Sequence, residues 1–107
     1  MMSGSRTITK GQDRLDNVHP GDILREDFLI GGEIPLDEVA EATGIDPAVL
    51  KAIIASQRDV DAEIDLRLAR YFGMSEGFFL GLQIDYDLEE VRRRDGADLD
   101  RIVPRAA

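Results

Sequence analysis

Apolar residues between positions 19 and 94 recur every three or four residues, which is the spacing of one face of an α-helix. No run alternates strictly between apolar and polar residues, so we expect no half-buried strand. Glycine and proline residues divide the pattern into short segments. The sequence therefore predicts an all-α domain with five helices, over residues 19–29, 35–44, 46–54, 61–72 and 75–94.

The second and third helical segments are short and nearly adjacent. Gly44 suits the left-handed conformation that often ends a helix, and Asp46 followed by Pro47 suits the start of the next one. We expect Ile45 to fill the corner between the two helices. This pattern is typical of a helix-turn-helix, although an ordinary helical hairpin in a small bundle has the same spacing.

The last two segments contain most of the aromatic residues. We expect the fourth helix to end at Gly73 and Ser75 to cap the fifth. Large apolar residues at helical spacing indicate core packing rather than a cofactor pocket. Those of the fifth helix are Phe78, Phe79, Leu82, Tyr86 and Leu88.

The composition fits one small domain without disulfides. The chain has 107 residues, of which 43% are hydrophobic, and it contains no cysteine. No apolar run approaches the roughly 18 to 20 residues that span a bilayer, and the first residues do not resemble a signal peptide. We therefore expect a cytoplasmic protein that does not enter a membrane.

The formal net charge of −9 is unevenly distributed. Residues 19–91 contain five basic and 17 acidic side chains, whereas both ends have a small positive excess. Because residues 1–18 and 95–107 lack apolar periodicity, we expect a flexible N-terminal arm and a flexible C-terminal tail around a folded domain of residues 19–94. Binding to DNA would have to depend on a few cations at one face.

No group of residues supports catalysis. His19 has no second histidine nearby, and we interpret it as a turn or capping residue. The carboxylate pairs Asp59/Asp61 and Asp85/Asp87 lack the spacing of a calcium loop, and the glycines lack phosphate-loop spacing. The sequence predicts a protein that is not an enzyme and takes no metal, cofactor or small-molecule substrate.

Three stretches resemble the HigA-type antitoxins, which belong to the lambda-repressor-like, or XRE-family, helix-turn-helix regulators. They are HPGDILREDFL, LDEVAEATGID and LRLARYFGMSEGFFLGLQIDYDL, within residues 19–88. The resemblance implies a compact five-helix domain and a homodimeric, cytoplasmic bacterial protein. It also implies that the protein neutralises a HigB-type mRNA-cleaving toxin and represses its own operon by binding palindromic operator DNA.

The resemblance places the DNA contacts on the third helix and the turn after it. In the family this stretch is polar and ends in Asn-Gly-Lys-Arg, whereas here Ala55-Ser56 replaces Asn-Gly. The candidate DNA-binding residues are Asp46, Ala48, Lys51, Ser56, Gln57 and Arg58. We expect further backbone contacts from three cations of the arm, Arg6, Lys10 and Arg14.

We infer the surfaces that bind protein partners from acidic side chains and from apolar residues of the last helix that the core does not need. An RNA-cleaving toxin must be basic, so acidic side chains on the first two helices are complementary to it. The candidate toxin-binding residues are Glu26, Asp27, Glu33, Glu38 and Glu41. The candidate dimer contacts are Tyr86, Leu88 and Val91. Two alternatives are a stand-alone transcriptional regulator and a protein-binding module whose DNA-reading face has decayed.

Overall fold

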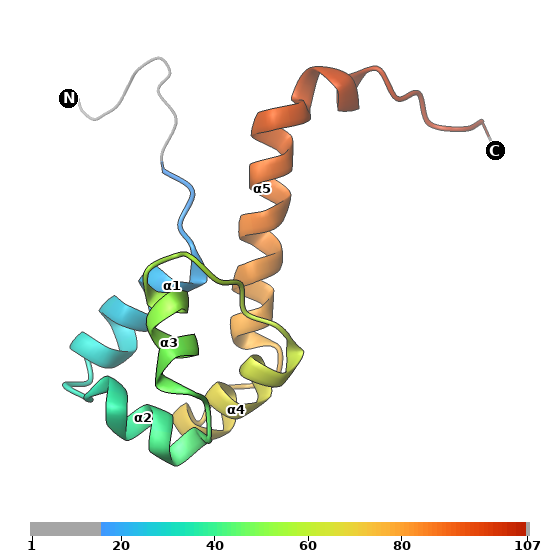
Figure 1. Ribbon diagram of the computed structural model, residues 1–107. Helices are drawn as coiled ribbons and strands as arrows, with labels where there is room; N and C mark the ends of the chain where they lie inside the picture. Colours follow the sequence, from blue (N-terminus) through green and yellow to red (C-terminus); the bar gives the residue numbers. More distant parts are fainter. Residues whose placement is uncertain (1–15, 107) are drawn as a thin grey trace, which may run out of the picture.

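The computed structural model describes residues 16–106 as six consecutive helical segments (Figure 1). They are α1 (Pro20–Ile23), η1 (Leu24–Ile30), α2 (Leu36–Thr43), α3 (Pro47–Ile54), α4 (Ala62–Phe72) and α5 (Phe78–Asp100). Because α1 continues directly into η1, these segments make five helices, and none of the described residues forms a strand. The predicted all-α fold is confirmed.

The first helix changes its winding after one turn. His19 caps α1, with its Nδ1 accepting a hydrogen bond from the Gly21 N–H at 2.9 Å. From Leu24 to Ile30 the backbone is a π-helix, which the sequence pattern did not predict. The Gly31 N–H accordingly donates to the Glu26 carbonyl, five residues earlier, at 2.9 Å. The predicted capping role of His19 is confirmed.

The start of α5 differs from the prediction. Its N-cap is Gly77, at φ 92°, and not Ser75. The reason is tertiary: the buried Asp65 of α4 accepts hydrogen bonds from the N–H groups of Gly77 at 2.6 Å and Leu80 at 2.9 Å. The N-terminus of α5 is therefore capped by a carboxylate of α4 and not by the local serine that the sequence suggested.

The helical region extends further than predicted at its C-terminal end, and a side-chain contact to α5 precedes α1. Helix α5 continues past the expected end at residue 94 to Asp100, with a non-helical Asp95 (φ −116°, ψ 16°) as an interruption. Near the other boundary, the Asn17 side chain donates to the Tyr86 carbonyl at 2.9 Å and to a Glu90 carboxylate oxygen at 3.0 Å. Residues 96–100 are thus helical, and the Asn17 side chain is hydrogen-bonded to α5. The rest of the expected arm, residues 1–15, lies outside the described residues.

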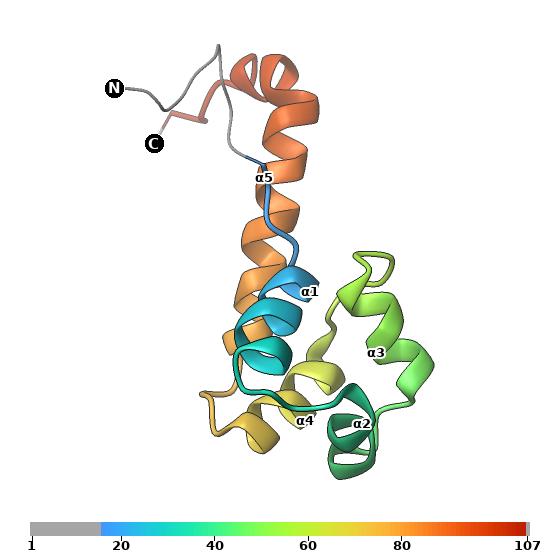
Figure 2. The same ribbon diagram turned by 90° about the vertical axis from the view of Figure 1, so that its left-hand side faces the viewer.

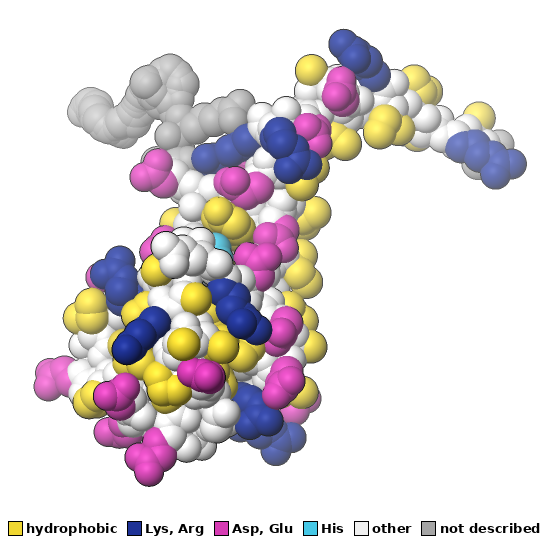
Figure 3. All heavy atoms as spheres, viewed as in Figure 1, with side chains coloured by type: hydrophobic (Ala, Val, Ile, Leu, Met, Phe, Trp, Pro, Cys, Tyr) yellow, Lys and Arg dark blue, Asp and Glu magenta, His cyan; other side chains and the backbone are white. Residues whose placement is uncertain are grey.

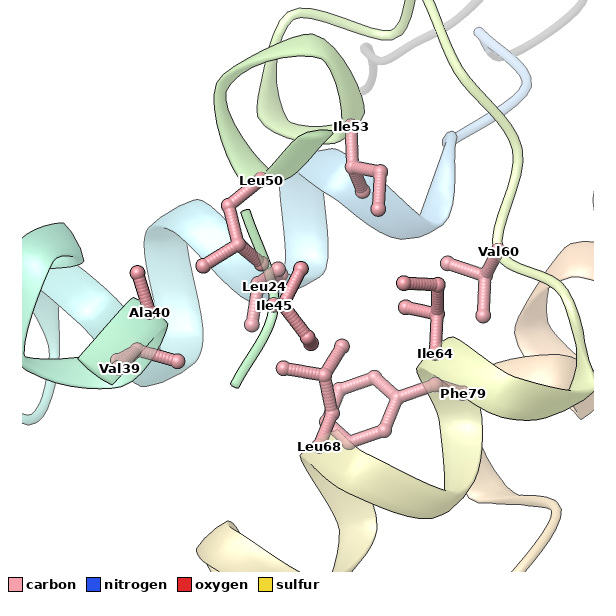
Figure 4. Close-up of a cluster of buried hydrophobic side chains, with 10 residues drawn as sticks. All are labelled: Leu24, Val39, Ala40, Ile45, Leu50, Ile53, Val60, Ile64, Leu68 and Phe79. Atoms are coloured by element: carbon pink, nitrogen blue, oxygen red, sulfur yellow. The ribbon is translucent and has the colours of Figure 1, made fainter. Parts of the chain in front are cut away.

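The core lies where all the helices meet (Figure 4). Its buried residues are Leu24, Val39, Ala40, Ile45, Leu50, Ile53, Val60, Ile64, Leu68 and Phe79. The Phe28 ring packs against Phe72 and Phe79, at centroid distances of 4.8 and 5.2 Å. Helix α5 then extends beyond this body, and Figure 2 shows the first helix between α5 and α3. No helix among the described residues is long and apolar enough to cross a membrane.

Candidate nucleic-acid interface

The turn between α2 and α3 is held by hydrogen bonds on both sides. Gly44 has φ 76° and Ile45 is buried, as predicted for a helix-turn-helix corner. The Thr43 hydroxyl donates to the Val39 carbonyl at 2.7 Å and accepts from the Ile45 N–H at 3.2 Å. The Arg67 guanidinium of α4 donates to the Thr43 carbonyl at 2.8 Å. The angle between α2 and α3 is therefore fixed by α4 as well as by the turn itself.

Helix α3 is placed by a close backbone approach to α1. Leu50 and Ile53 of α3 are buried in the core. Gly21 is buried against the end of α3, and a Cβ on it would lie 1.8 Å from the Ile53 carbonyl oxygen. Only glycine permits this contact. The His-Pro-Gly sequence thus sets the position of the helix that carries the candidate DNA contacts.

The end of α3 is a Schellman turn with serine in the left-handed position. Ser56 has φ 61°, its N–H donates to the Ile53 carbonyl at 2.9 Å, and the Gln57 N–H donates to the Ala52 carbonyl at 2.8 Å. Glycine or asparagine is usual at this position, and serine is strained there. The two hydrogen bonds hold this turn in place against the strain, and they leave Ser56, Gln57 and Arg58 exposed.

The structure brings the six predicted DNA-binding residues together on α3 and this turn, and all six are exposed. Asp46 is partly engaged within the protein, because its Oδ1 accepts from the Ala48 N–H at 2.8 Å as the predicted N-cap. Figure 3 shows hydrophobic side chains gathered over α3, basic side chains beside them and acidic ones around the lower rim.

Two cations of this face have no carboxylate partner within residues 16–106. Of the five basic residues between positions 19 and 91, Arg25, Arg67 and Arg70 form ion pairs, the latter two with Glu63 at 3.2 Å and Glu76 at 3.4 Å. Among the described residues, no carboxylate oxygen lies within 4 Å of the Lys51 or Arg58 side chain. The positive charge of residues 19–91 that has no described carboxylate partner therefore lies on α3 and the turn after it.

The predicted toxin-binding carboxylates lie on three consecutive elements. Glu26 and Asp27 belong to η1, Glu33 to the following turn, and Glu38 and Glu41 to α2, and all five are exposed. Two of them have internal partners: Glu26 forms an ion pair with Arg25, and the Tyr71 hydroxyl donates to Glu38 at 2.9 Å. This bond raises the pKa of Tyr71. The other three carboxylates, Asp27, Glu33 and Glu41, are better placed to contact a partner.

The predicted dimer contacts do not share one face of α5. The Tyr86 ring packs edge-on against His19 at 5.0 Å, and burial with nearby carboxylates raises the pKa of Tyr86. Leu88, two residues further, lies on the opposite side of the helix. Its neighbours there are Val91 and Ile84, which is 50% exposed and which sequence reasoning missed. The apolar strip of α5 is therefore Ile84, Leu88 and Val91.

Two buried polar residues that support the site were also missed. Gln83 accepts from the Val60 N–H at 2.8 Å and donates to Asp87 at 2.9 Å, so it ties the segment after α3 to α5. Asp65 likewise joins two elements, because its carboxylate accepts hydrogen bonds from the first N–H groups of α5. Gln83 lies on the same helical face as Phe79, and Asp65 lies on the same face as Leu68. A polar residue on such an apolar face indicates a buried hydrogen bond.

The site shows no arrangement of metal ligands. No group of three or more His, Asp or Glu side chains in residues 16–106 could hold a metal ion. The His19 imidazole is buried, and its Nε2 lies 3.8 Å from Asp59 without a hydrogen bond. What the face offers is exposed cations, a side-chain amide and a hydroxyl on a projecting helix, which is the chemistry of a groove-binding surface.

Comparisons with known proteins agree with this geometry. No family model matches the chain. It is 33% identical to virulence-associated protein I of Dichelobacter nodosus, over 92% of this chain and 90% of that protein. It is 34% identical to YbaQ of Escherichia coli K12, described as an uncharacterized HTH-type transcriptional regulator, over 78% of this chain and 75% of that protein. The structure of Pseudomonas aeruginosa antitoxin HigA with the higBA promoter has 32% identity and a TM-score of 0.78, over 85% of this chain and all of that one.

The five-helix fold with its exposed α3 defines a helix-turn-helix protein of the lambda-repressor-like class. The identities and the coverage are specific enough to go further within this class. The chain belongs to the HigA-type antitoxins.

Proposed function

We propose that this chain is the antitoxin of a type II toxin-antitoxin pair, which neutralises a HigB-type mRNA-cleaving toxin and represses its own operon. The observation that carries the DNA role concerns two cations at the helix-turn-helix of an acidic segment, Lys51 and Arg58, which have no carboxylate partner in the described part of the chain. Phosphate oxygens are the natural partners of such cations. The solved HigA of P. aeruginosa with its promoter supports the same role.

The number of phosphate contacts favours a dimer aided by the arm. Specific DNA binding uses about 6 to 10 phosphate contacts, and two chains supply two copies each of Lys51 and Arg58. Arg6, Lys10 and Arg14 of the arm, which lie outside the described residues, are the additional cations. A symmetric pair of chains joined through α5 presents two α3 helices to a palindrome, about 34 Å apart.

A reporter assay tests the DNA role. The chain's own upstream region is fused to a reporter gene, and the protein is supplied from a second plasmid. We expect repression by the wild type and loss of repression by the double variant Lys51→Ala/Arg58→Ala. The matched control is Arg70→Ala, which removes an exposed cation of α4 that is already paired with Glu76. Equal repression by all three proteins would contradict the proposed contacts.

The toxin role rests on family membership and on the acidic surface of η1 and α2. The test is co-expression with each flanking gene, followed by growth measurement and pull-down. We expect rescue from one neighbour, and loss of rescue when Glu26, Asp27 and Glu41 are changed to lysine. Reversing three acidic residues of α5 instead, Asp85, Asp98 and Asp100, should leave rescue intact.

The two experiments together separate the alternatives. Repression without a toxic neighbour indicates a stand-alone transcriptional regulator. Rescue without repression indicates a protein-binding module whose DNA-reading face has decayed. Rescue and repression together are the result that we expect.

A further inference from the structure

The solvent-facing arc of α3 consists mainly of methyl groups. At 3.6 residues per turn, Ala48, Lys51, Ala52 and Ala55 fall within about 100° of the helix circumference, opposite the buried Leu50. Ala48, Lys51 and Ala55 are exposed and Ala52 is half-buried. Lys51 is therefore the one side chain of this arc that can donate a hydrogen bond to a base.

Asp46 and Gln57 carry further polar groups at the two ends of this arc. One oxygen of the Asp46 carboxylate already accepts the Ala48 N–H at 2.8 Å. Beyond the strained Ser56, the exposed Gln57 carries a side-chain amide, the group that pairs with the N6 and N7 atoms of adenine. Two independent features, the alanine arc and Gln57, thus suit the same kind of base pair.

We propose that α3 reads thymine, with the Ala48, Ala52 and Ala55 methyl groups packing against thymine 5-methyl groups in the major groove. This inference rests on the operator binding proposed above, and it names the base pairs that form the centre of each half-site. The thymine methyl is the apolar feature that the major groove displays, and alanine is one of its usual contacts. A·T pairs supply both that methyl and the adenine edge for Gln57.

The chemistry can be tested without disturbing the protein. Uracil pairs as thymine does but lacks the 5-methyl group, so a duplex with uracil removes only the proposed contact. The probe is the segment of the chain's own upstream region that the protein protects from cleavage, with each thymine replaced singly by uracil. Removing one buried methyl should weaken binding about threefold to fourfold, whereas uracil in the flanking sequence should change nothing.

A cycle of protein and DNA variants then assigns the contacts. Ala55 is the C-cap of α3, so Ala55→Gly removes its methyl at little cost to the helix. If a uracil weakens wild-type binding because the contact with the Ala55 methyl is lost, the Ala55→Gly variant should bind the uracil and thymine duplexes with equal affinity. The control is Ala97→Gly, an exposed alanine near the end of α5, which should keep the full sensitivity to uracil.

The outcomes distinguish this inference from the proposed function. Uracil sensitivity that disappears in Ala55→Gly, or in the corresponding Ala48→Gly or Ala52→Gly, supports thymine reading. Equal affinity of the wild type for every thymine and uracil duplex overturns the inference and leaves operator binding intact. The inference is also overturned by uracil effects that are the same in all the glycine variants. Absence of binding to the thymine duplex itself overturns both proposals.

Discussion

Replacing Gly21 by alanine is the perturbation that most directly tests how α3 is positioned. The new Cβ would lie 1.8 Å from the Ile53 carbonyl oxygen and 2.7 Å from its carbonyl carbon. Carbon and oxygen atoms normally stay about 3.3 Å or more apart, and both groups here belong to the backbone, so no side-chain rotation relieves the clash. The first helix and α3 must separate by about the missing distance.

The expected cost lies at the upper end of that for overpacking, about 3 kcal/mol in the free energy of unfolding. A domain of this size has about 5 to 15 kcal/mol in total, so Gly21→Ala should lower the melting temperature by about 10 to 20 °C. The assay is urea and thermal unfolding followed by circular dichroism, at equal protein concentration because the proposed dimer would be stabilised by mass action.

The matched control is Gly96→Ala. Gly96 lies in α5, and a Cβ on it would have no neighbour within 4 Å. The same chemical change should therefore leave stability unchanged or raise it by up to about 1 kcal/mol. A stability of Gly21→Ala within about 0.5 kcal/mol of the wild type would refute the proposed role of this glycine.

Three further experiments test other parts of the structure. Asp65→Asn should lower the free energy of urea unfolding by about 2 kcal/mol, because one of its two charge-assisted hydrogen bonds to the N–H groups of Gly77 and Leu80 is lost. Asp61→Asn, one turn earlier at the N-cap of α4, should cost little because asparagine caps equally well. Equal losses would argue against the tertiary cap. Ser56→Gly should raise stability by about 0.5 to 1 kcal/mol by relieving the left-handed strain, and a loss of stability would show that serine is not strained there. Ile84→Glu together with Leu88→Glu should produce a monomer in sedimentation velocity at concentrations where the wild type is a dimer; an unchanged sedimentation coefficient would exclude the α5 strip.

Local signals in the sequence predicted most of the helix ends. Asp46 and Asp61 cap α3 and α4 by bonding N–H groups two and three residues ahead, and Gly44 and Gly73 are left-handed C-caps. These interactions join residues that are close in the chain, so composition and spacing reveal them.

The features that could not be predicted depend on tertiary contacts. The N-terminus of α5 is set by Asp65, 12 residues before Gly77, so the local candidate Ser75 was wrong. The π-helical winding of η1 has no signal in apolar spacing, because its first turns still place Leu24 and Phe28 toward the core.

The role of Tyr86 at a dimer surface stays a prediction, but its position on the helix differs from that of Leu88. Tyr86 and Leu88 are two residues apart, which on an α-helix places them on opposite sides. Tyr86 instead covers the buried His19, a contact between segments 67 residues apart in the chain. Ile84, four residues before Leu88, shares its face and is exposed.

The central claim is that this acidic chain binds DNA through the unpaired cations of α3 and its turn. The most direct measurement is a fluorescence-anisotropy titration of its own upstream DNA at about 50 and 200 mM salt. We predict binding at micromolar protein or below, and a salt slope that falls by about 3.6 per dimer in Lys51→Ala/Arg58→Ala, since each lost phosphate contact removes about 0.9. Absence of binding by the wild type, or an unchanged slope in the double variant, would contradict the claim.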